Sequence, residues 1–276
     1  MNIRSKNIQL QYQGYLDTPL LWNDDALLGL KQLELDKQAT SHFYESIADQ
    51  LLLGKRVERF VNAELEQIEN IEILLENAQV KNKKTTIGEI DCILKQDGIP
   101  IHLEIIYKFY LYDSSVGDTE IDRWIGPNRK DSLVKKLHKL KSKQLPLLYN
   151  TYARTVLNKV NIDPAHTLQR VLFKAQLFTP FQENVAFNLL NKECLSGFYI
   201  HFPEIQQLSN CKFYIPIKVD WLTEVQSNTD WLSYLEFEKI ISALIAEKRA
   251  PLCWIKFPNG IMQKFFVVWW GGLMMH

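Results

Sequence analysis

Two strand-like segments joined by an Asp-Gly turn constrain the fold of this chain most. The stretch Gly88–Lys108, which covers most of both segments, reads GEIDCILKQDGIPIHLEIIYK. Apolar residues dominate at 86–95 and at 99–111, as in strands that contribute to a core. Between them, Gln96-Asp97-Gly98 has the residues that a tight hairpin turn requires. The sequence therefore predicts an antiparallel hairpin at this point of the chain.

The hairpin carries two acidic residues, Asp91 and Glu104, whose spacing favours a joint site. Side chains alternate between the faces of a strand, so Glu104 shares a face with Lys108, whereas the opposite face of 99–111 is wholly apolar or aromatic. Two carboxylates across a hairpin can bind a hard cation such as Mg²⁺ or Mn²⁺. Such an ion can activate water for attack on a phosphodiester. The alternative is a solvated sheet face on which Glu104 and Lys108 are surface charges.

Composition limits the other classes of function. The chain has 276 residues, of which 46% are hydrophobic and 23% charged, which is typical of a soluble globular protein. The formal net charge is zero, so any affinity for nucleic acid has to come from local clustering. The four cysteines form no CxxC pair, which indicates reduced thiols rather than a zinc site. The N-terminus lacks the apolar run of a signal peptide, and the longest apolar stretch, 265–275, is too short to span a bilayer. We expect a cytoplasmic protein with no membrane partner.

The expected order of elements is helix, three strands, helix, strand. A helix is predicted within 42–68 and another over 132–145, ending before Pro146, because apolar residues recur at three- and four-residue steps. Strands are predicted at 71–80, 86–95, 99–111 and 171–178, and a short packing helix at 20–36. This order predicts an α/β or α+β fold. We expect one elaborated domain over 1–276, with a core at about 42–180 and a C-terminal extension at about 181–276.

Gly-Glu-Ile-Asp on one strand, with an acid about a dozen positions later on the next, resembles the PD-(D/E)XK nuclease superfamily. That superfamily has the same helix, three strands, helix, strand core, called restriction-endonuclease-like. The wider chain is similar to a bacterial family of unknown function suspected of this fold, through the segments 53–58, 88–111 and 126–146. The resemblance implies hydrolysis of nucleic acid with Mg²⁺ or Mn²⁺, with DNA favoured over RNA.

The resemblance also implies roles for single residues. Asp91 and Glu104 would hold the cation, with the carbonyl of Ile105 as a further ligand. Glu58 would face the site from the N-terminal helix and orient a metal-bound water, although a surface glutamate among basic neighbours is the alternative. Gln144 would contact the site from the second helix; a satisfied core amide is the alternative.

One position departs from the pattern, because Ile106 stands where the superfamily has lysine. Lys108 is the nearest candidate for the catalytic lysine, on the same face and roughly 7 Å further along an extended strand. Its side chain can fold back to the metal-bound water or form an unrelated ion pair. Three interpretations therefore stay open: an active nuclease, a catalytically eroded module that binds nucleic acid or a protein, and an interaction protein with dispersed charges.

The predicted helix after Ser132 is basic within a neutral protein. Its apolar stripe lies opposite four lysines that fall within an arc of about 100° on an ideal helix. These lysines are Lys135, Lys136, Lys139 and Lys143. With Arg129 just before the helix, this face could follow a phosphate backbone and add salt-dependent affinity. A solvated lysine face is the alternative.

Overall fold

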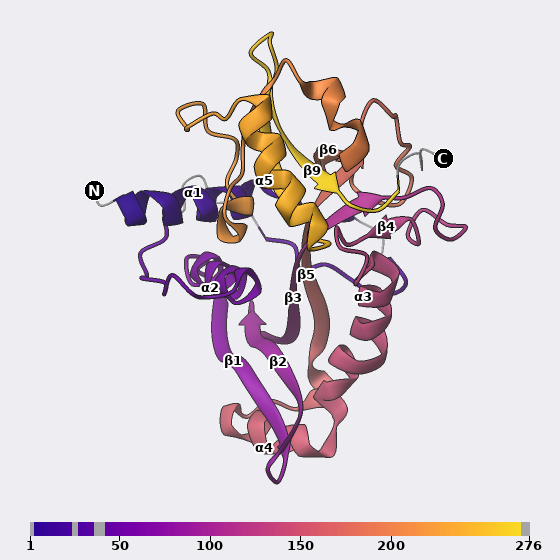
Figure 1. Cartoon of the computed structure of the whole chain (residues 1–276). Coiled ribbons are helices and arrows are strands. Elements are labelled where there is room, and N and C mark those ends of the chain that lie inside the picture. The colour runs from indigo at the N-terminus through magenta and orange to yellow at the C-terminus, as the bar shows by residue number, and fades with distance from the viewer. Residues whose placement is uncertain (1–2, 24–26, 36–41, 272–276) are drawn as a thin grey trace. The chain divides into compact units, whose positions relative to one another are not determined.

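The computed structural model describes residues 3–23, 27–35 and 42–271, and it divides into two compact units. The hairpin unit comprises 20–107 and 135–174, and the C-terminal unit comprises 1–19, 108–134 and 175–276. Helices and a large mixed sheet make up the structure, so a mixed α/β class is confirmed (Figure 1). Strands β3 (Ile99–Tyr112) and β5 (Leu168–Pro180) each contribute residues to both units.

The hairpin unit contains the predicted order of elements. Its helices and strands, apart from β3 and β5, are α2 (Leu53–Leu65), β1 (Ile71–Asn82), β2 (Thr85–Gln96), α3 (Leu133–Lys139) and α4 (Arg154–Leu157). The strand order is β1-β2-β3-β5, with antiparallel pairing of β1 to β2 and of β2 to β3. In Figure 1, α2 lies near one end of the β1–β2 ribbon and α4 near the other.

The Asp-Gly turn forms as predicted. Asp97 has φ 51° and Gly98 has φ 78°, the two positive values that a type I′ hairpin turn requires. The turn fixes the register from Gln96↔Ile99 to Cys92↔Leu103. One step further along the same register, Asp91 lies opposite Glu104, so the turn itself determines that these two acids face each other.

The alternative of a solvated face on β3, with Glu104 as a surface charge, does not hold. Both faces of the strand are largely buried from Ile101 to Leu111. The side chains that were expected on the polar face, His102, Glu104, Ile106 and Tyr110, are all below 4% exposed. Lys108, the remaining residue expected on that face, is half-buried.

Two predicted helices differ from those observed. The helix within 42–68 begins only at Leu53, and the described residues of 20–36 form bridges beside β5, Leu20↔Lys174 and Gln32↔Val171, instead of a helix. Leu21, Leu30 and Leu33 of that segment are buried, so its leucines contribute to the core from an extended chain. Residues 24–26 and 36 lie outside the described part.

The basic helix is also shorter than predicted. The α-helical part ends at Lys139, and the chain continues as a π-helix over Leu140–Gln144 and a 3-10 helix over Leu145–Tyr149. Pro146 has no N–H to donate and disfavours α-helical geometry just before it, which is consistent with the change of helix type.

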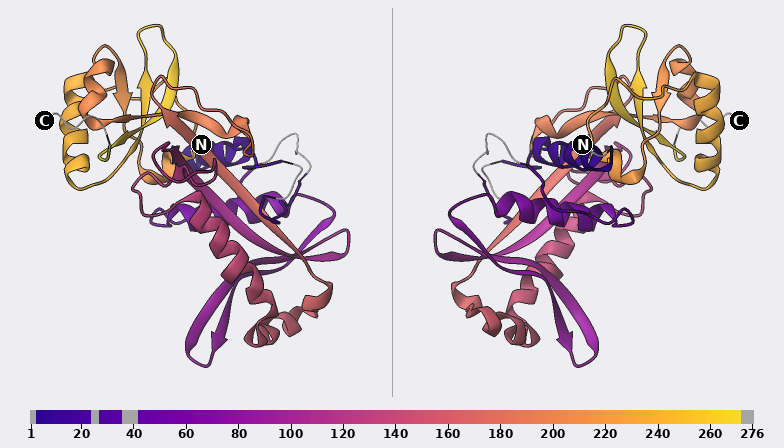
Figure 2. Two further views of the ribbon diagram at one scale, coloured as in Figure 1. Left: turned by 90° about the vertical axis from the view of Figure 1, so that its right-hand side faces the viewer. Right: turned by 90° about the vertical axis from the view of Figure 1, so that its left-hand side faces the viewer.

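An apolar cluster holds the far part of the β1–β2 ribbon against the segment that follows the π-helix. The buried members are Val80, Ile90, Ile93, Leu147, Leu148, Ala153, Leu157 and Ile162. Figure 2 shows the ribbon in purple and this segment in rose from two sides. A Cβ atom at Gly88 of the GEID sequence would lie 2.7 Å from Leu147 Cδ2, so a larger residue there would displace the Leu147 side chain.

The C-terminal unit has its own core. Its elements are α1 (Ile3–Asp17), β4 (Trp124–Ile125), β6 (Leu195–His201), β7 (Lys212–Tyr214), α5 (Tyr234–Ala246), β8 (Leu252–Lys256) and β9 (Met262–Val268). The strand order is β3-β5-β6-β9-β8-β7, with parallel pairs at β5–β6 and β6–β9 and antiparallel pairs from β9 to β7. The rings of Phe213 and Phe237 stack at 4.1 Å between β7 and α5. No helix in the described part of the chain is long and apolar enough to cross a membrane.

We expect Gly88→Val to destabilise the protein, because the added side chain overlaps Leu147 inside a packed cluster. Overpacking of this kind costs about 1–3 kcal/mol. Thermal denaturation should show a lower Tm for Gly88→Val. In a background that carries Leu147→Ala, Gly88→Val should lower the stability less than it does in the wild type. Equal losses in the two backgrounds would contradict the proposed contact.

Candidate functional site

Asp91 on β2 and Glu104 on β3 meet at the end of the β2–β3 ladder. Their carboxyl groups contact each other, and the main-chain N–H of Ile105 donates to Asp91 Oδ2 at 3.0 Å. Glu104 is 0% exposed and Asp91 is half-buried. The hairpin therefore brings together the two acids that its sequence singled out, and it removes them from most of the solvent.

Burial makes these two acids difficult to ionise. It raises the pKa of Asp91 to about 6, with the negative charge of Glu104 adding to the rise. Burial likewise raises the pKa of Glu104 to about 7, against the favourable charge of Lys136 and hydrogen bonds from its neighbours. The pair titrates as one coupled system. A nearby divalent cation would favour the doubly ionised form, so the electrostatics of the pair fit a metal site.

Both oxygens of Glu104 have hydrogen-bond partners. Oε1 lies 3.1 Å from His102 Nε2, and Oε2 accepts from Gln144 Nε2. Burial lowers the pKa of His102 to about 4, so its ring is neutral near pH 7. Gln169 Nε2 lies 3.3 Å from His102 Nδ1 and also donates to Leu145 O at 2.6 Å. An amide donating to Nδ1 leaves the ring proton on Nε2, from where His102 donates to Glu104.

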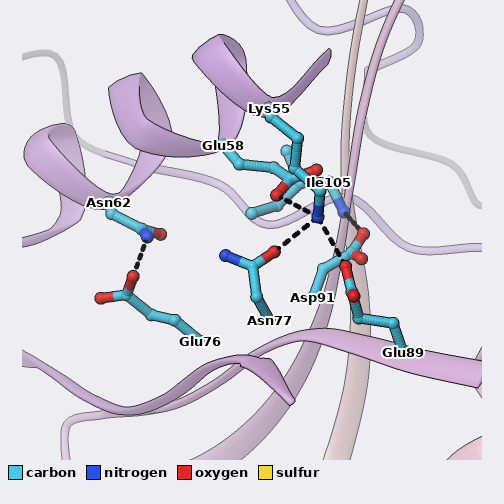
Figure 3. Close-up of polar contacts among 8 residues, drawn as sticks. All are labelled: Lys55, Glu58, Asn62, Glu76, Asn77, Glu89, Asp91 and Ile105. Atoms are coloured by element: carbon cyan, nitrogen blue, oxygen red, sulfur yellow. Dashed lines mark hydrogen bonds and ion pairs between the residues drawn. The ribbon is translucent and has the colours of Figure 1, made fainter. Parts of the chain in front are cut away.

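Helix α2 brings Glu58 and Lys55 to the edge of the same site. Figure 3 shows the ammonium of Lys55 among three oxygens, Glu58 Oε2 at 2.8 Å, Asn77 Oδ1 at 2.8 Å and Glu89 Oε1 at 2.5 Å. Burial raises the pKa of Glu58, Lys55 opposes the rise, and the charge of Asp91 adds to it. Glu58 is therefore close enough to Asp91 for their charges to interact.

Ile106 occupies the position where the superfamily pattern has lysine, and it is a core residue. The nearest lysine on β3, Lys108, is paired with another carboxylate. Ile106 is 3% exposed. Lys108, in the C-terminal unit, donates from Nζ to Asp131 Oδ2 at 2.6 Å. Arg129, in the same unit, donates to Asp113 Oδ2 at 2.6 Å, and its guanidinium lies 4.8 Å from the ring centroid of Trp270. Both cations thus have carboxylate partners within their own unit.

The structure separates the four lysines that were predicted to share a face. Lys135, Lys139 and Lys143 are exposed, whereas Lys136 is half-buried. Lys136 Nζ donates to Gln144 Oε1 at 2.8 Å, and its charge lowers the pKa of both Asp91 and Glu104. Lys143 lies in the π-helix, where the arc calculated for an α-helix no longer applies.

Sequence reasoning missed three residues that contact the site. Lys55 had one detectable signal, its i,i+3 spacing from Glu58 on a helix. Gln169 had none. Asn77 adopts φ 49° within β1, a left-handed conformation that asparagine tolerates better than most residues. The register of β1 and β2, Glu76↔Cys92 and Ala78↔Ile90, places Asn77 opposite Asp91.

The oxygen atoms of the site are of the type that a hard cation binds, but they are few. Among residues 3–23, 27–35 and 42–271, no group of three or more His, Cys, Asp or Glu side chains is arranged to hold a metal ion. Two carboxylates and the Ile105 carbonyl make an oxygen set of the kind that Mg²⁺ uses when it retains several waters. The mutual repulsion of the two acids is what a cation would relieve.

These features describe a mixed α/β protein with a buried pair of carboxylates bordered by lysines. The chain belongs to the family described as a domain of unknown function, DUF1853, whose model matches residues 10–268. No curated protein and no solved structure matches the chain.

The raised pKa values predict that ionising the pair destabilises the fold. For Asp91 the folded pKa of about 6 exceeds the ordinary value of 3.8, so its favourable contribution to stability is present below pH 4 and is lost as the pH rises through 6. At pH 8 with chelator present, we expect Asp91→Asn to raise the free energy of unfolding by about 2 kcal/mol, and so to raise Tm. Near pH 4.5 the variant and the wild type should differ little. Exposed Asp118→Asn is the control, and an equal change at both pH values would contradict the assignment.

Proposed function

We propose that the Asp91–Glu104 pair is the centre of a divalent-metal-dependent hydrolase that cleaves phosphodiester bonds in nucleic acid, on a restriction-endonuclease-like core of the PD-(D/E)XK class. The observation that carries the proposal is the contact between the buried Glu104 and the half-buried Asp91 on adjacent strands. Burial raises the pKa of both acids, and the charge of Glu104 raises that of Asp91 further. Isolated surface carboxylates would not have these properties. DNA is favoured over RNA as the substrate.

Each residue of the site has a role in this chemistry. A bound Mg²⁺ or Mn²⁺ would supply a water of lowered pKa and neutralise charge on the phosphoryl group. Asp91 and Glu104, with the Ile105 carbonyl, would hold that cation. His102 and Gln144 orient Glu104 by binding one oxygen each. Glu58, beside Asp91, would orient the attacking water as its oxygen bonds to phosphorus and the ester bond breaks.

Substrate binding falls to the lysines that the structure leaves exposed. Lys135, Lys139 and Lys143 extend into solvent from the segment that also carries Gln144. Contacts of lysine with phosphate are independent of sequence and weaken with salt. Because Arg129 is engaged by Asp113, we assign it a smaller share of substrate binding.

One observation favours a second candidate, a nuclease-like module that binds nucleic acid or a protein without cutting. The expected lysine position is filled by the buried Ile106, and Lys108 is paired with Asp131. This candidate predicts salt-sensitive binding with no metal-dependent turnover.

We expect Asp91→Asn and Glu104→Gln each to abolish Mg²⁺- or Mn²⁺-dependent cleavage, because each removes a charged oxygen ligand. Loss of such a ligand should lower the rate by roughly a hundredfold or more. The assay is a panel of single-stranded, duplex and branched DNA and of RNA, with and without metal. Circular dichroism should show both variants folded.

Asp118→Asn, which alters an exposed acid, is the matched control and should cleave like the wild type. Unchanged metal-dependent turnover by either site variant would eliminate the proposed centre. Binding without cleavage by the wild type on every substrate would favour the second candidate.

A further inference from the structure

Lys136 differs from every other lysine of the basic segment. It is half-buried where Lys135, Lys139 and Lys143 are exposed. Its Nζ donates to Gln144 Oε1 at 2.8 Å, and the same amide donates from Nε2 to Glu104 Oε2. One amide group therefore links the ammonium of Lys136 to a carboxylate of the acidic pair. A lysine that only attracts phosphate from the surface needs no such link.

The helix changes type between the two residues that make this link. Lys136 lies in α3 and Gln144 is the last residue of the π-helix Leu140–Gln144. On an ideal α-helix, residues eight apart point about 80° away from each other. A π-helix turns less per residue and so reduces this angle, which brings both side chains to one face. Single π turns occur frequently at functional sites.

We propose that Lys136, held by Gln144, is the catalytic lysine of the acidic site, in place of a lysine on β3. Its positive charge stabilises the negative charge that develops on the phosphoryl oxygens as water attacks. Since it moves no proton, its contribution is electrostatic. The assignment rests on the proposed function, and it gives the site the cation that Ile106 does not provide.

The other nearby lysines fit this role less well. The ammonium of Lys55 donates hydrogen bonds to Glu58, Asn77 and Glu89. It therefore connects α2 to β1 and β2. Lys108 is paired with Asp131. Of these three lysines, Lys136 alone lowers the pKa of both Asp91 and Glu104, which places its charge beside the pair as a whole.

The first test measures metal affinity and needs no turnover. Removing a positive charge beside two carboxylates should let them bind a cation more tightly. We expect Lys136→Met to bind Mn²⁺ roughly three- to tenfold more tightly than the wild type in calorimetric titration. Lys108→Met should bind as the wild type does. Lys139→Met should change the affinity less than Lys136→Met does, because the charge of Lys139 lowers the pKa of Glu104 less than that of Lys136 does. Unchanged Mn²⁺ affinity in Lys136→Met would show that its charge is not beside the pair.

The second test separates rate from affinity for the nucleic acid. Lys136→Met should lower kcat by roughly a hundredfold or more with little change in KM, whereas exposed Lys139→Met should raise KM and weaken its salt dependence. Lys136→Arg should restore part of kcat, and Gln144→Leu should lower kcat while leaving the charge in place. Equal Tm values would exclude unfolding as the cause.

The outcomes distinguish the two proposals. If Asp91→Asn is inactive but Lys136→Met keeps the wild-type kcat, the hydrolase stands and the assignment of Lys136 is wrong. If the wild type binds Mn²⁺ and cleaves no substrate, the hydrolase is wrong and the catalytic role of Lys136 is lost with it. The Mn²⁺ affinities would then still decide whether Lys136 belongs to the acidic site.

Discussion

The contact between the buried carboxyl of Glu104 and the half-buried carboxyl of Asp91 is the constraint around which the polar groups of the hairpin unit are arranged. A buried acid resists ionisation, and a second one beside it resists further. The surrounding polar groups favour the ionised form of the two acids. The Ile105 N–H donates to Asp91, and His102 and Gln144 donate to Glu104. Lys136 adds positive charge. A protein gains no stability from such a pair at neutral pH. The presence of such a pair at the end of a well-formed ladder supports the proposed functional role more than a role in folding.

Four separate segments converge on this pair, each for a local reason. The type I′ turn at Asp97-Gly98 fixes the register that sets Asp91 opposite Glu104. Helix α2 presents Glu58 and Lys55 along one side. The change from α- to π-helix after Lys139 aligns Lys136 with Gln144. Gln169, the second residue of β5, fixes the tautomer of His102. Rigid elements thus position every side chain that the chemistry would need.

The sequence predicted the features that depend on residues close together along the chain. The hairpin, its turn and the order of elements follow from periodicity and turn chemistry, which act locally. The sequence left a solvated second face of β3 open as an alternative, because the contacts that bury it come from distant residues such as Gln144 and Gln169. The helix predicted at 20–36 failed for the same reason: its leucines pack beside β5 from an extended chain. The role of Lys136 depends on a π-helix, and a calculation based on 3.6 residues per turn placed it with the exposed lysines.

A physical argument also favours a lysine on the helix, at position 136, over a lysine on β3, at position 106. Position 106 lies in a strand buried on both faces, so an ammonium there would lose most of its hydration beside the core. A lysine that reaches the pair from a helix at the rim keeps part of its solvent and gains an amide acceptor in Gln144. Its charge can then act on the same two carboxylates at a lower desolvation cost. Isoleucine at 106 and lysine at 136 are therefore compatible parts of one arrangement, in which the strand supplies core packing and the helix supplies the charge.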